Sequence, residues 1–233
     1  MDFNLSEEHL QAVKVVRDYC RKEVAPVIKE ADRTHTMHPS ILPRMGGELG
    51  ILGICIPEKY GGQGFDYITL GLVCEELEYA DTSLRVVMSV HMGLNSMALL
   101  QWGTAEQKQK YLVPQAKGEK YAMFGLTELG VGSDVANISS TAHRDGNDYI
   151  LNGEKMWISM ATKAHHVLWV ARTNLERPDP RDQLSAFIVD ASWPGVTRRN
   201  LRGKLGVAPA KAGFQGFQSD QHIHRHVRAR SHF

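Results

Sequence analysis

The sequence has few cysteines and almost no net charge, and each shortage excludes a class of protein. Its 233 residues include three cysteines, Cys20, Cys55 and Cys74, which are odd in number and widely spaced. This pattern predicts reduced thiols in a cytosolic protein, and it argues against disulfides and against a zinc site. A formal net charge of +1 provides no global field that would attract nucleic acid or an anionic membrane.

Long apolar runs are also missing from the chain. No stretch has the length of a bilayer span, so we expect no membrane segment. The first residues read MDFNLSEE and lack the basic and apolar regions of a signal peptide. These features predict a cytoplasmic location. What remains is an ordinary globular composition, 42% hydrophobic and 23% charged, with room for one large domain or two smaller ones.

Helical periodicity dominates the chain up to about residue 120. Ser6 is a good helix N-cap, Pro26 should bend or break the first helix, and Asp81 or Thr82 should cap a later one. Residues 104–107 read TAEQ, which predicts a capping box. We expect helices over residues 6–32, 39–49, 67–79, 82–102 and from 104 onwards, with a loop over residues 54–64.

After residue 120 the pattern changes to that of strands. Two turns are expected, at residues 145–147 and at Asn152-Gly153, the latter a type I′ hairpin turn that would place Trp157 and Ser159 on one face of the next strand. Strands are predicted over residues 121–126, 138–143, 148–151, 155–159, 166–172 and 184–189, with a polar connection over residues 174–183. Helices followed by strands predict an α+β protein of two domains.

The end of the chain has neither period. Residues 215–233 hold four of the eleven histidines, and alternate histidines at positions 222, 224 and 226 would share one face of a strand. A metal site there is one reading. The reading we favour is an aberrant, disordered tail over residues 219–233, with no metal bound.

A glycine-rich stretch after the first predicted strand carries the strongest functional pattern. Residues 124–137 read FGLTELGVGSDVAN. A strand that opens into glycines and short hydroxyl side chains brings backbone N–H groups close to a flat or charged ligand. An ordinary loop between two strands is the alternative. A dinucleotide-binding fold is set aside, because these glycines do not lie in a βαβ unit.

A second stretch, residues 151–159, reads LNGEKMWIS. In this order and at this separation, the two stretches resemble the motifs of the acyl-CoA dehydrogenase family. Weaker matches are PEKYGGQG at residues 57–64 and GTAEQKQKYL at residues 103–112, and the resemblance extends to about Val207. The departures lie at Leu129, where proline is common, and at Val131 and Asn137, where small residues are usual.

The resemblance implies an N-terminal all-α helical domain over residues 1–120 and a β-barrel-like or β-sandwich middle domain, incomplete, over residues 121–218. It implies FAD as cofactor, α,β-dehydrogenation of an acyl-CoA thioester, an electron-transfer flavoprotein as electron acceptor, and a homo-oligomer. In the family a further C-terminal domain supplies the catalytic glutamate, so no residue here is assigned as the base. We therefore expect this chain alone to bind FAD weakly and to have little or no activity. The alternatives are a non-catalytic fragment or interaction module, and an oxygen-using acyl-CoA oxidase.

The same resemblance assigns contacts to single residues. Thr127 would offer its hydroxyl to the flavin ring, Ser133 would lie near the pyrophosphate or the substrate thioester, Trp157 would stack on the ring, and Ser159 would bond near its N5 atom. A plain core aromatic is the alternative for Trp157, and a structural role is favoured for Glu128. The implied cofactor contacts are Phe124, Leu126, Thr127, Gly132, Ser133, Trp157, Ile158 and Ser159.

Residues 78–91 resemble the glutaryl-CoA branch of the family in particular. There an arginine at the position of Arg85 binds the distal carboxylate of the substrate, and a glutamate at the position of Glu78 lies nearby. A guanidinium suits a carboxylate because the two can form paired hydrogen bonds. The alternative is a solvated or ion-paired helix residue. Ser133 and Arg85 are therefore the candidate substrate contacts.

Overall fold

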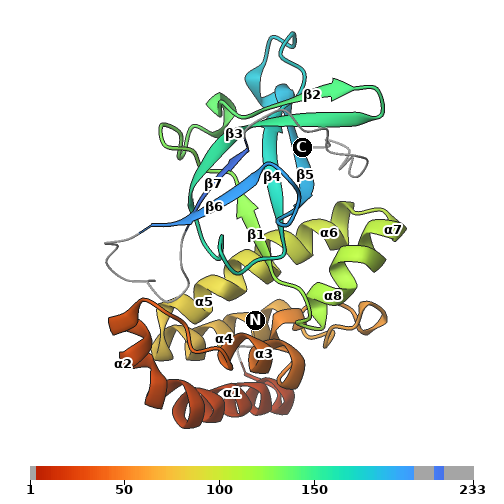
Figure 1. The fold of residues 1–233 in the computed structure, drawn as a ribbon. Helices are drawn as coiled ribbons and strands as arrows, with labels where there is room; N and C mark the ends of the chain where they lie inside the picture. The colour runs from red at the N-terminus through yellow and green to blue at the C-terminus, as the bar shows by residue number, and fades with distance from the viewer. Residues whose placement is uncertain (1–3, 202–212, 218–233) are drawn as a thin grey trace. The chain divides into compact units, whose positions relative to one another are not determined.

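Helices occupy the first half of the chain and strands the second (Figure 1). The computed structural model describes residues 4–201 and 213–217. These residues fall into two units, a helical unit that ends at Lys120 and a sheet unit that begins at Tyr121. The predicted α+β class is confirmed. The tail predicted over residues 219–233, its histidines and the boundary after residue 218 lie outside the described residues.

The first helical segment shows how the sequence sets its start. Ser6 caps it, since its Oγ accepts a hydrogen bond from the backbone of His9 at 3.2 Å while His9 Nδ1 accepts one from Ser6 N–H at 3.2 Å. Pro26 does not end the segment. The five residues before Ala25 widen into a π-helical turn, and Pro26 lies in the first turn of the helix that follows.

The remaining caps of the helical unit agree with the sequence. Asp81 accepts a hydrogen bond from Ser83 N–H at 2.7 Å, and Thr104 and Gln107 form the predicted capping box. The unit contains α1 (Glu7–Tyr19), η1 (Cys20–Val24), α2 (Ala25–Thr34), α3 (Ile41–Pro43), η2 (Arg44–Glu48), η3 (Ile51–Gly53), η4 (Glu58–Tyr60), α4 (Tyr67–Ala80), α5 (Thr82–Met88), η5 (Ser89–Ser96), α6 (Met97–Trp102), α7 (Ala105–Gln107), η6 (Lys108–Leu112) and α8 (Val113–Ala116).

The sheet unit is a single seven-stranded sheet with mixed strand directions. Its neighbours follow the order β1-β4-β2-β3-β7-β6, and β5 pairs with β4. The sheet is built from β1 (Ala122–Gly125), β2 (Thr141–Asp145), β3 (Asp148–Ile158), β4 (His166–Arg172), β5 (Leu184–Asp190), β6 (Val196–Asn200) and β7 (Gly213–Phe217), with short 3₁₀ turns η7 (Val135–Asn137) and η8 (Pro180–Gln183).

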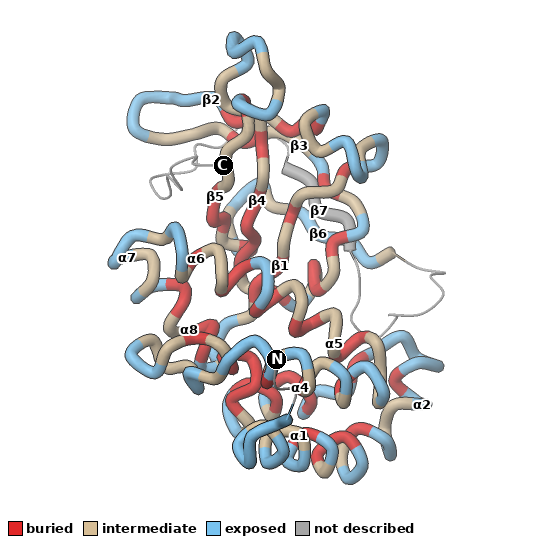
Figure 2. Tube along the Cα trace, turned by 180° about the vertical axis from the view of Figure 1, so that it is seen from behind, coloured by how far each residue is buried: buried red, intermediate tan, exposed pale blue. Residues whose placement is uncertain are grey.

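Strand β4 is the core of this sheet. It pairs in parallel with β1 and antiparallel with β5, and its first four residues are buried (Figure 2). A strand covered on both faces reads as a near-continuous apolar run, as HVLWVAR does here. Trp169 is the largest fully buried side chain of the described residues.

The predicted turn at Asn152-Gly153 is wrong. Both residues lie within β3, which runs unbroken over 11 residues, and Asn152 pairs with Thr141 of β2. Gly153 has φ +146°, and a Cβ built there would lie 2.2 Å from Ser140 Oγ. The glycine therefore permits a close approach of two chain segments rather than a turn. The actual β2–β3 turn is the other predicted one, where Gly146 has φ +57°.

Two further features bear on the sequence expectations. The strands β6 and β7 were not predicted. Cys20 is buried, Cys55 and Cys74 are half-buried, and all three are free thiols, as expected. Among the residues described, no helix is long and apolar enough to cross a membrane.

Candidate functional site

Strand β1 opens into a loop of residues 126–140, which we call the glycine loop. Its first part is a tight turn at Leu129-Gly130. Glu128 N–H donates to Val131 O at 3.0 Å, and Val131 N–H donates to Glu128 O at 3.2 Å. Open space surrounds the Cβ positions of Gly130 and Gly132, and residues 132–134 are exposed. The loop thus presents glycine backbone to its surroundings.

The glycine loop lies directly beside the strand that carries Trp157. Met156 N–H of β3 donates to Thr127 O at 2.9 Å. Lys155, the residue before it, donates from Nζ to Leu126 O, also at 2.9 Å. The two stretches that matched the family motifs are separated in sequence but adjacent in space.

Trp157 has an unusual backbone for a tryptophan. Its φ is +62°, in the left-handed region that bulky side chains avoid. Its side chain is 56% exposed, which excludes the core-aromatic alternative. The register of β3 shifts between Lys155 and Ile158, and the strand ends at Ile158. The predicted alternation of Trp157 and Ser159 along one strand face is therefore wrong, because Ser159 lies beyond the strand end.

Several polar groups of the predicted cofactor contacts make no hydrogen bond to any residue that the structure describes. Within the described part of the chain, the hydroxyls of Thr127, Ser133 and Ser159 and the indole N–H of Trp157 make no hydrogen bond to another residue. Polar atoms left unpaired in a folded protein are satisfied by water or by a ligand. The Thr127 and Ser159 donors lie in segments next to the exposed Trp157, and this combination fits a planar ligand with polar ring atoms, such as a flavin.

The apolar residues among the predicted cofactor contacts differ in how far they are buried. Phe124 and Leu126 are half-buried at the end of β1 and the start of the glycine loop. Ile158 is 3% exposed, so its side chain belongs to the core and only its backbone remains for a ligand.

Glu128 is a structural anchor under the glycine loop. It is 5% exposed, and its Oε2 accepts hydrogen bonds from the N–H and Oγ of Ser139, both at 2.6 Å. Its Oε1 accepts from the N–H and Oγ of Ser140 at 3.0 and 2.6 Å and from Lys155 Nζ at 2.8 Å. Burial raises the pKa of this carboxyl, but the bonds from Lys155, Ser139 and Ser140 outweigh it and hold the pKa at about 2. With both oxygens occupied, Glu128 is not placed to act as a base.

Lys155 is the residue of this region that the sequence reasoning missed. It is fully buried, and its ammonium lies 5.3 Å from the centre of the Trp169 ring. Burial lowers its pKa, and Glu128 opposes that shift. A signal was present: Leu151, Gly153 and Lys155 occupy alternate positions, so an inward-facing Leu151 predicts an inward-facing Lys155.

Arg85 and Glu78 form an ion pair within the helical unit. Arg85 Nε donates to Glu78 Oε2 at 2.7 Å, and an Nη1 contact with Ser89 Oγ measures 3.1 Å. The hydrogen bond from Arg85, followed by one from Thr82, lowers the pKa of Glu78. Both side chains are more than a third exposed, so the guanidinium remains accessible while paired.

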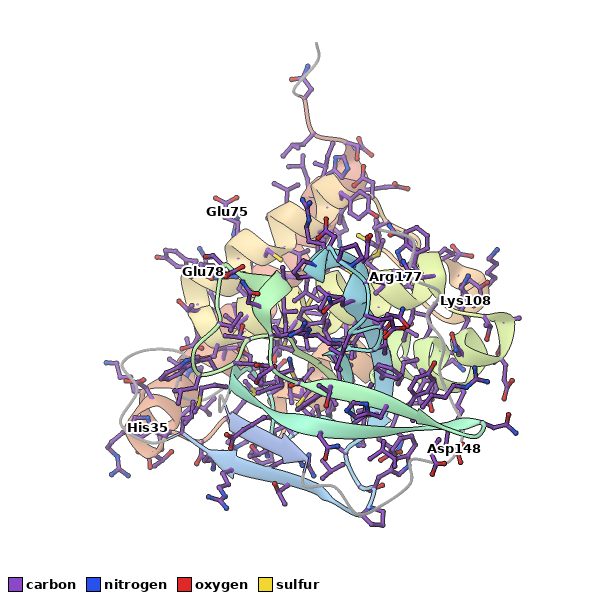
Figure 3. All side chains as sticks on the ribbon, turned by 90° about the horizontal axis from the view of Figure 1, so that it is seen from above. His35, Glu75, Glu78, Lys108, Asp148 and Arg177 are labelled. Atoms are coloured by element: carbon purple, nitrogen blue, oxygen red, sulfur yellow. The ribbon has the colours of Figure 1, made fainter. Side chains whose placement is uncertain are left out.

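The acidic residues of α4 do not form a catalytic group. Glu75 is exposed and projects away from its helix in Figure 3, whereas Glu78 accepts a hydrogen bond from Arg85 of α5. Glu76 pairs with Arg17 of α1 at 2.6 Å. Among the described residues, no group of three His, Cys, Asp or Glu side chains is arranged to hold a metal ion.

Comparison with known proteins identifies the family. The N-terminal domain model of acyl-CoA dehydrogenases matches residues 6–119, and the middle domain model matches residues 123–219. The probable acyl-CoA dehydrogenase YngJ of Bacillus subtilis is 37% identical over 89% of this chain and 54% of its own length. The mitochondrial short-chain specific acyl-CoA dehydrogenase of Mus musculus is 36% identical over 87% of this chain and 48% of its own.

Solved structures agree with the sequence matches. Butyryl-CoA dehydrogenase from Megasphaera elsdenii superposes with a TM-score of 0.88 at 30% identity, over 94% of this chain and 57% of that one. A chain from a study of the electron transferring flavoprotein of Acidaminococcus fermentans gives 0.89 at 34% identity, over 94% and 57%. A glutaryl-CoA dehydrogenase from Mycobacterium smegmatis in complex with FADH2 gives 0.85 at 31% identity, over 92% and 53%. The chain spans about half the length of the relatives it matches, and it belongs to the acyl-CoA dehydrogenase family.

Proposed function

We propose that this chain supplies the flavin-contacting half of an FAD-dependent enzyme that introduces an α,β double bond into an acyl-CoA thioester. The family membership and a relative solved with FADH2 support the cofactor. An electron-transferring flavoprotein named in the work on another relative supports such a protein as the electron acceptor.

The single observation that carries the proposal is the hydrogen bond from Met156 N–H to Thr127 O at 2.9 Å. It fixes the glycine loop against the strand next to Trp157. When bound, FAD would supply the two-electron oxidation by taking the β-hydrogen as hydride, and the α-proton would pass to a base. The chain's own residues would hold the ring: Trp157 against its face, Thr127 and Ser159 as donors to its polar edge, and Ser133 toward the pyrophosphate or the thioester.

A flavin titration of the chain tests this assignment. Thr127→Val keeps the shape of the side chain but removes the hydroxyl, and we expect it to weaken FAD binding about fivefold to tenfold, the usual value of one hydrogen bond. Thr141→Val on β2 is the matched control and should bind FAD like the unmodified chain. Absence of any flavin binding by the unmodified chain, or equal binding by both variants, would contradict the assignment.

The catalytic base is not assigned to any described residue. Glu128 is fully bonded, and the acidic side chains of α4 are solvated or paired. Because the chain spans about half of its relatives, a second candidate is a non-catalytic fragment of the same fold. Mixing the chain with FAD and butyryl-CoA tests this candidate: bleaching of the flavin absorbance would show turnover and exclude it, whereas constant absorbance is the result expected of a chain with no assigned base. Peroxide formed during such turnover would instead indicate an oxidase.

Substrate choice is the second part of the proposal. We propose that Arg85 recognises a distal carboxylate, with Glu78 as its resting partner at 2.7 Å. On the full-length enzyme, Arg85→Ala should reduce the preference for glutaryl-CoA over butyryl-CoA at least tenfold. Arg181→Ala removes another exposed, ion-paired arginine and should leave the preference unchanged. Equal preference before and after Arg85→Ala would remove this part of the proposal.

A further inference from the structure

A buried ion pair lies beneath the glycine loop. Lys155 is 0% exposed and Glu128 is 5% exposed, and their charged atoms lie 2.8 Å apart. The Lys155 ammonium also donates to Leu126 O at 2.9 Å and lies over the Trp169 ring. The pair therefore has a complete set of partners inside the sheet unit.

Stability alone does not account for this pair. Removing two charges from water costs several kcal/mol per ion, and an apolar pair of similar volume is often as stable or more stable. Buried ion pairs of this kind specify a particular arrangement in some proteins. The arrangement specified here can be read from the partners of the two residues.

These partners lie at both ends of the glycine loop. At its start, the Lys155 ammonium donates to Leu126 O and to Glu128 Oε1, and Glu128 is itself a residue of the loop. At its end, Ser139 and Ser140 each give Glu128 one backbone and one hydroxyl hydrogen bond. The ion pair thus joins both ends of the loop to β3, beside two backbone bonds, from Met156 N–H to Thr127 O at 2.9 Å and from Arg172 N–H to Ser140 O at 2.8 Å.

Between these ends, local hydrogen bonds shape residues 128–131 and 134–138, and residues 132 and 133 lie between these two bonded turns. Within the described part of the chain, Gly132 and Ser133 make no hydrogen bond to another residue. Their positions, and that of the Thr127 hydroxyl, are set mainly by where the two ends are held. A change at the ion pair would therefore move atoms that the pair does not touch.

We infer that Glu128 and Lys155 are positioning residues that fix the glycine loop for flavin binding. Neither is a catalytic residue. The inference rests on the proposed function for its ligand, but the ordering of the loop is a property of the chain without flavin and can be measured separately.

The test uses Glu128→Gln and Lys155→Met, which nearly preserve side-chain size, and the double variant, which leaves no unpaired buried charge. Matched controls are Glu154→Gln and Lys163→Met, two exposed residues of the same unit. Amide hydrogen exchange of the flavin-free chain is recorded for the glycine loop and for β4 and β5. FAD affinity is then measured for each variant.

We expect exchange of the hydrogen-bonded loop amides, those of Glu128, Val131, Ser139 and Ser140, to rise at least tenfold in both single variants and in the double variant, while β4 and β5 stay protected. FAD affinity should fall about tenfold or more in the same three variants and stay constant in the controls. If the unmodified chain binds no FAD, the proposed function fails but the exchange data still decide the positioning role. Unchanged exchange in the loop, an equal rise across β4 and β5, or full recovery of loop protection in the double variant would each overturn the inference.

Discussion

Position 153 requires glycine for two reasons, its backbone conformation and the close approach of Ser140. Its φ of +146° is strained for any side chain, and the added Cβ would meet Ser140 Oγ at 2.2 Å and Ser140 Cα at 2.8 Å. Ser140 cannot move freely, because its N–H and hydroxyl are bonded to Glu128. The constraint on Gly153 is thus connected to the anchor of the glycine loop.

We predict that Gly153→Ala destabilises the sheet unit by about 2 kcal/mol or more, from backbone strain and overpacking. Gly130→Ala is the matched control. Nothing lies within 4 Å of the Cβ position of Gly130, and its φ lies outside the positive range that side chains avoid. It should change stability by less than about 0.5 kcal/mol. Urea unfolding followed through the sheet unit measures both, and a Gly153→Ala variant as stable as the control would contradict the packing described.

The lowered pKa of Glu128 predicts how the stability of the sheet unit depends on pH. Its pKa is about 2 in the folded chain against an ordinary 4.5. A lowered pKa means that the folded state holds the ionised form, so the stabilisation is complete above pH 4.5 and is lost as pH falls toward 2. The sheet unit should therefore lose stability through that range, and Glu128→Gln should lose less of it. Parallel acid unfolding curves for the two proteins would contradict this.

At the scale of elements, local chemistry predicts the helices well. The N-caps at Ser6, Asp81 and Thr104 all form as expected, because a cap needs only residues within a few positions of itself. The π-helical turn before Pro26 was not predicted. Local sequence indicates that a helix forms there, but it does not indicate which turn of that helix is widened.

Strand pairing overrides local preference where the prediction failed. Asn-Gly favours a turn in isolation, but residues 141–145 pair along β3 and draw Asn152 into the sheet. The side chain of Trp157 was expected to follow a regular strand, and the register shift beside it is a tertiary feature. The glycine loop and the Trp157 strand were expected to meet, and they do; the buried Lys155 that joins them was visible only in the strand alternation.

The capping box of α7 gives a prediction at this scale. Thr104 Oγ1 accepts from Gln107 N–H at 3.2 Å, and Gln107 Oε1 accepts from Thr104 N–H at 2.9 Å. Thr104→Ala should lower the stability of the helical unit by about 1 kcal/mol, whereas Thr104→Ser should keep most of it. Denaturant unfolding together with amide exchange over residues 105–116 measures the loss, and equal stability of Ala and Ser variants would show that the cap contributes nothing.

At the scale of the whole molecule, the chain combines a helical unit and a sheet unit that each match one domain of the family. The proposed flavin contacts of the glycine loop and β3 all belong to the sheet unit. The proposed carboxylate contact, Arg85, belongs to the helical unit. Substitutions in the sheet unit therefore test the flavin contacts, and substitutions in the helical unit test the carboxylate contact separately.

The emission of FAD bound to the chain tests the central claim most directly. An indole stacked on the flavin ring quenches its fluorescence, and among the four tryptophans of the chain only Trp157 is expected to lie there. We measure the emission at saturating FAD for the unmodified chain, for Trp157→Phe and for Trp193→Phe as control. The account predicts dim bound flavin in the unmodified chain and the control, and several-fold brighter emission in Trp157→Phe. Equal emission from all three proteins would contradict it.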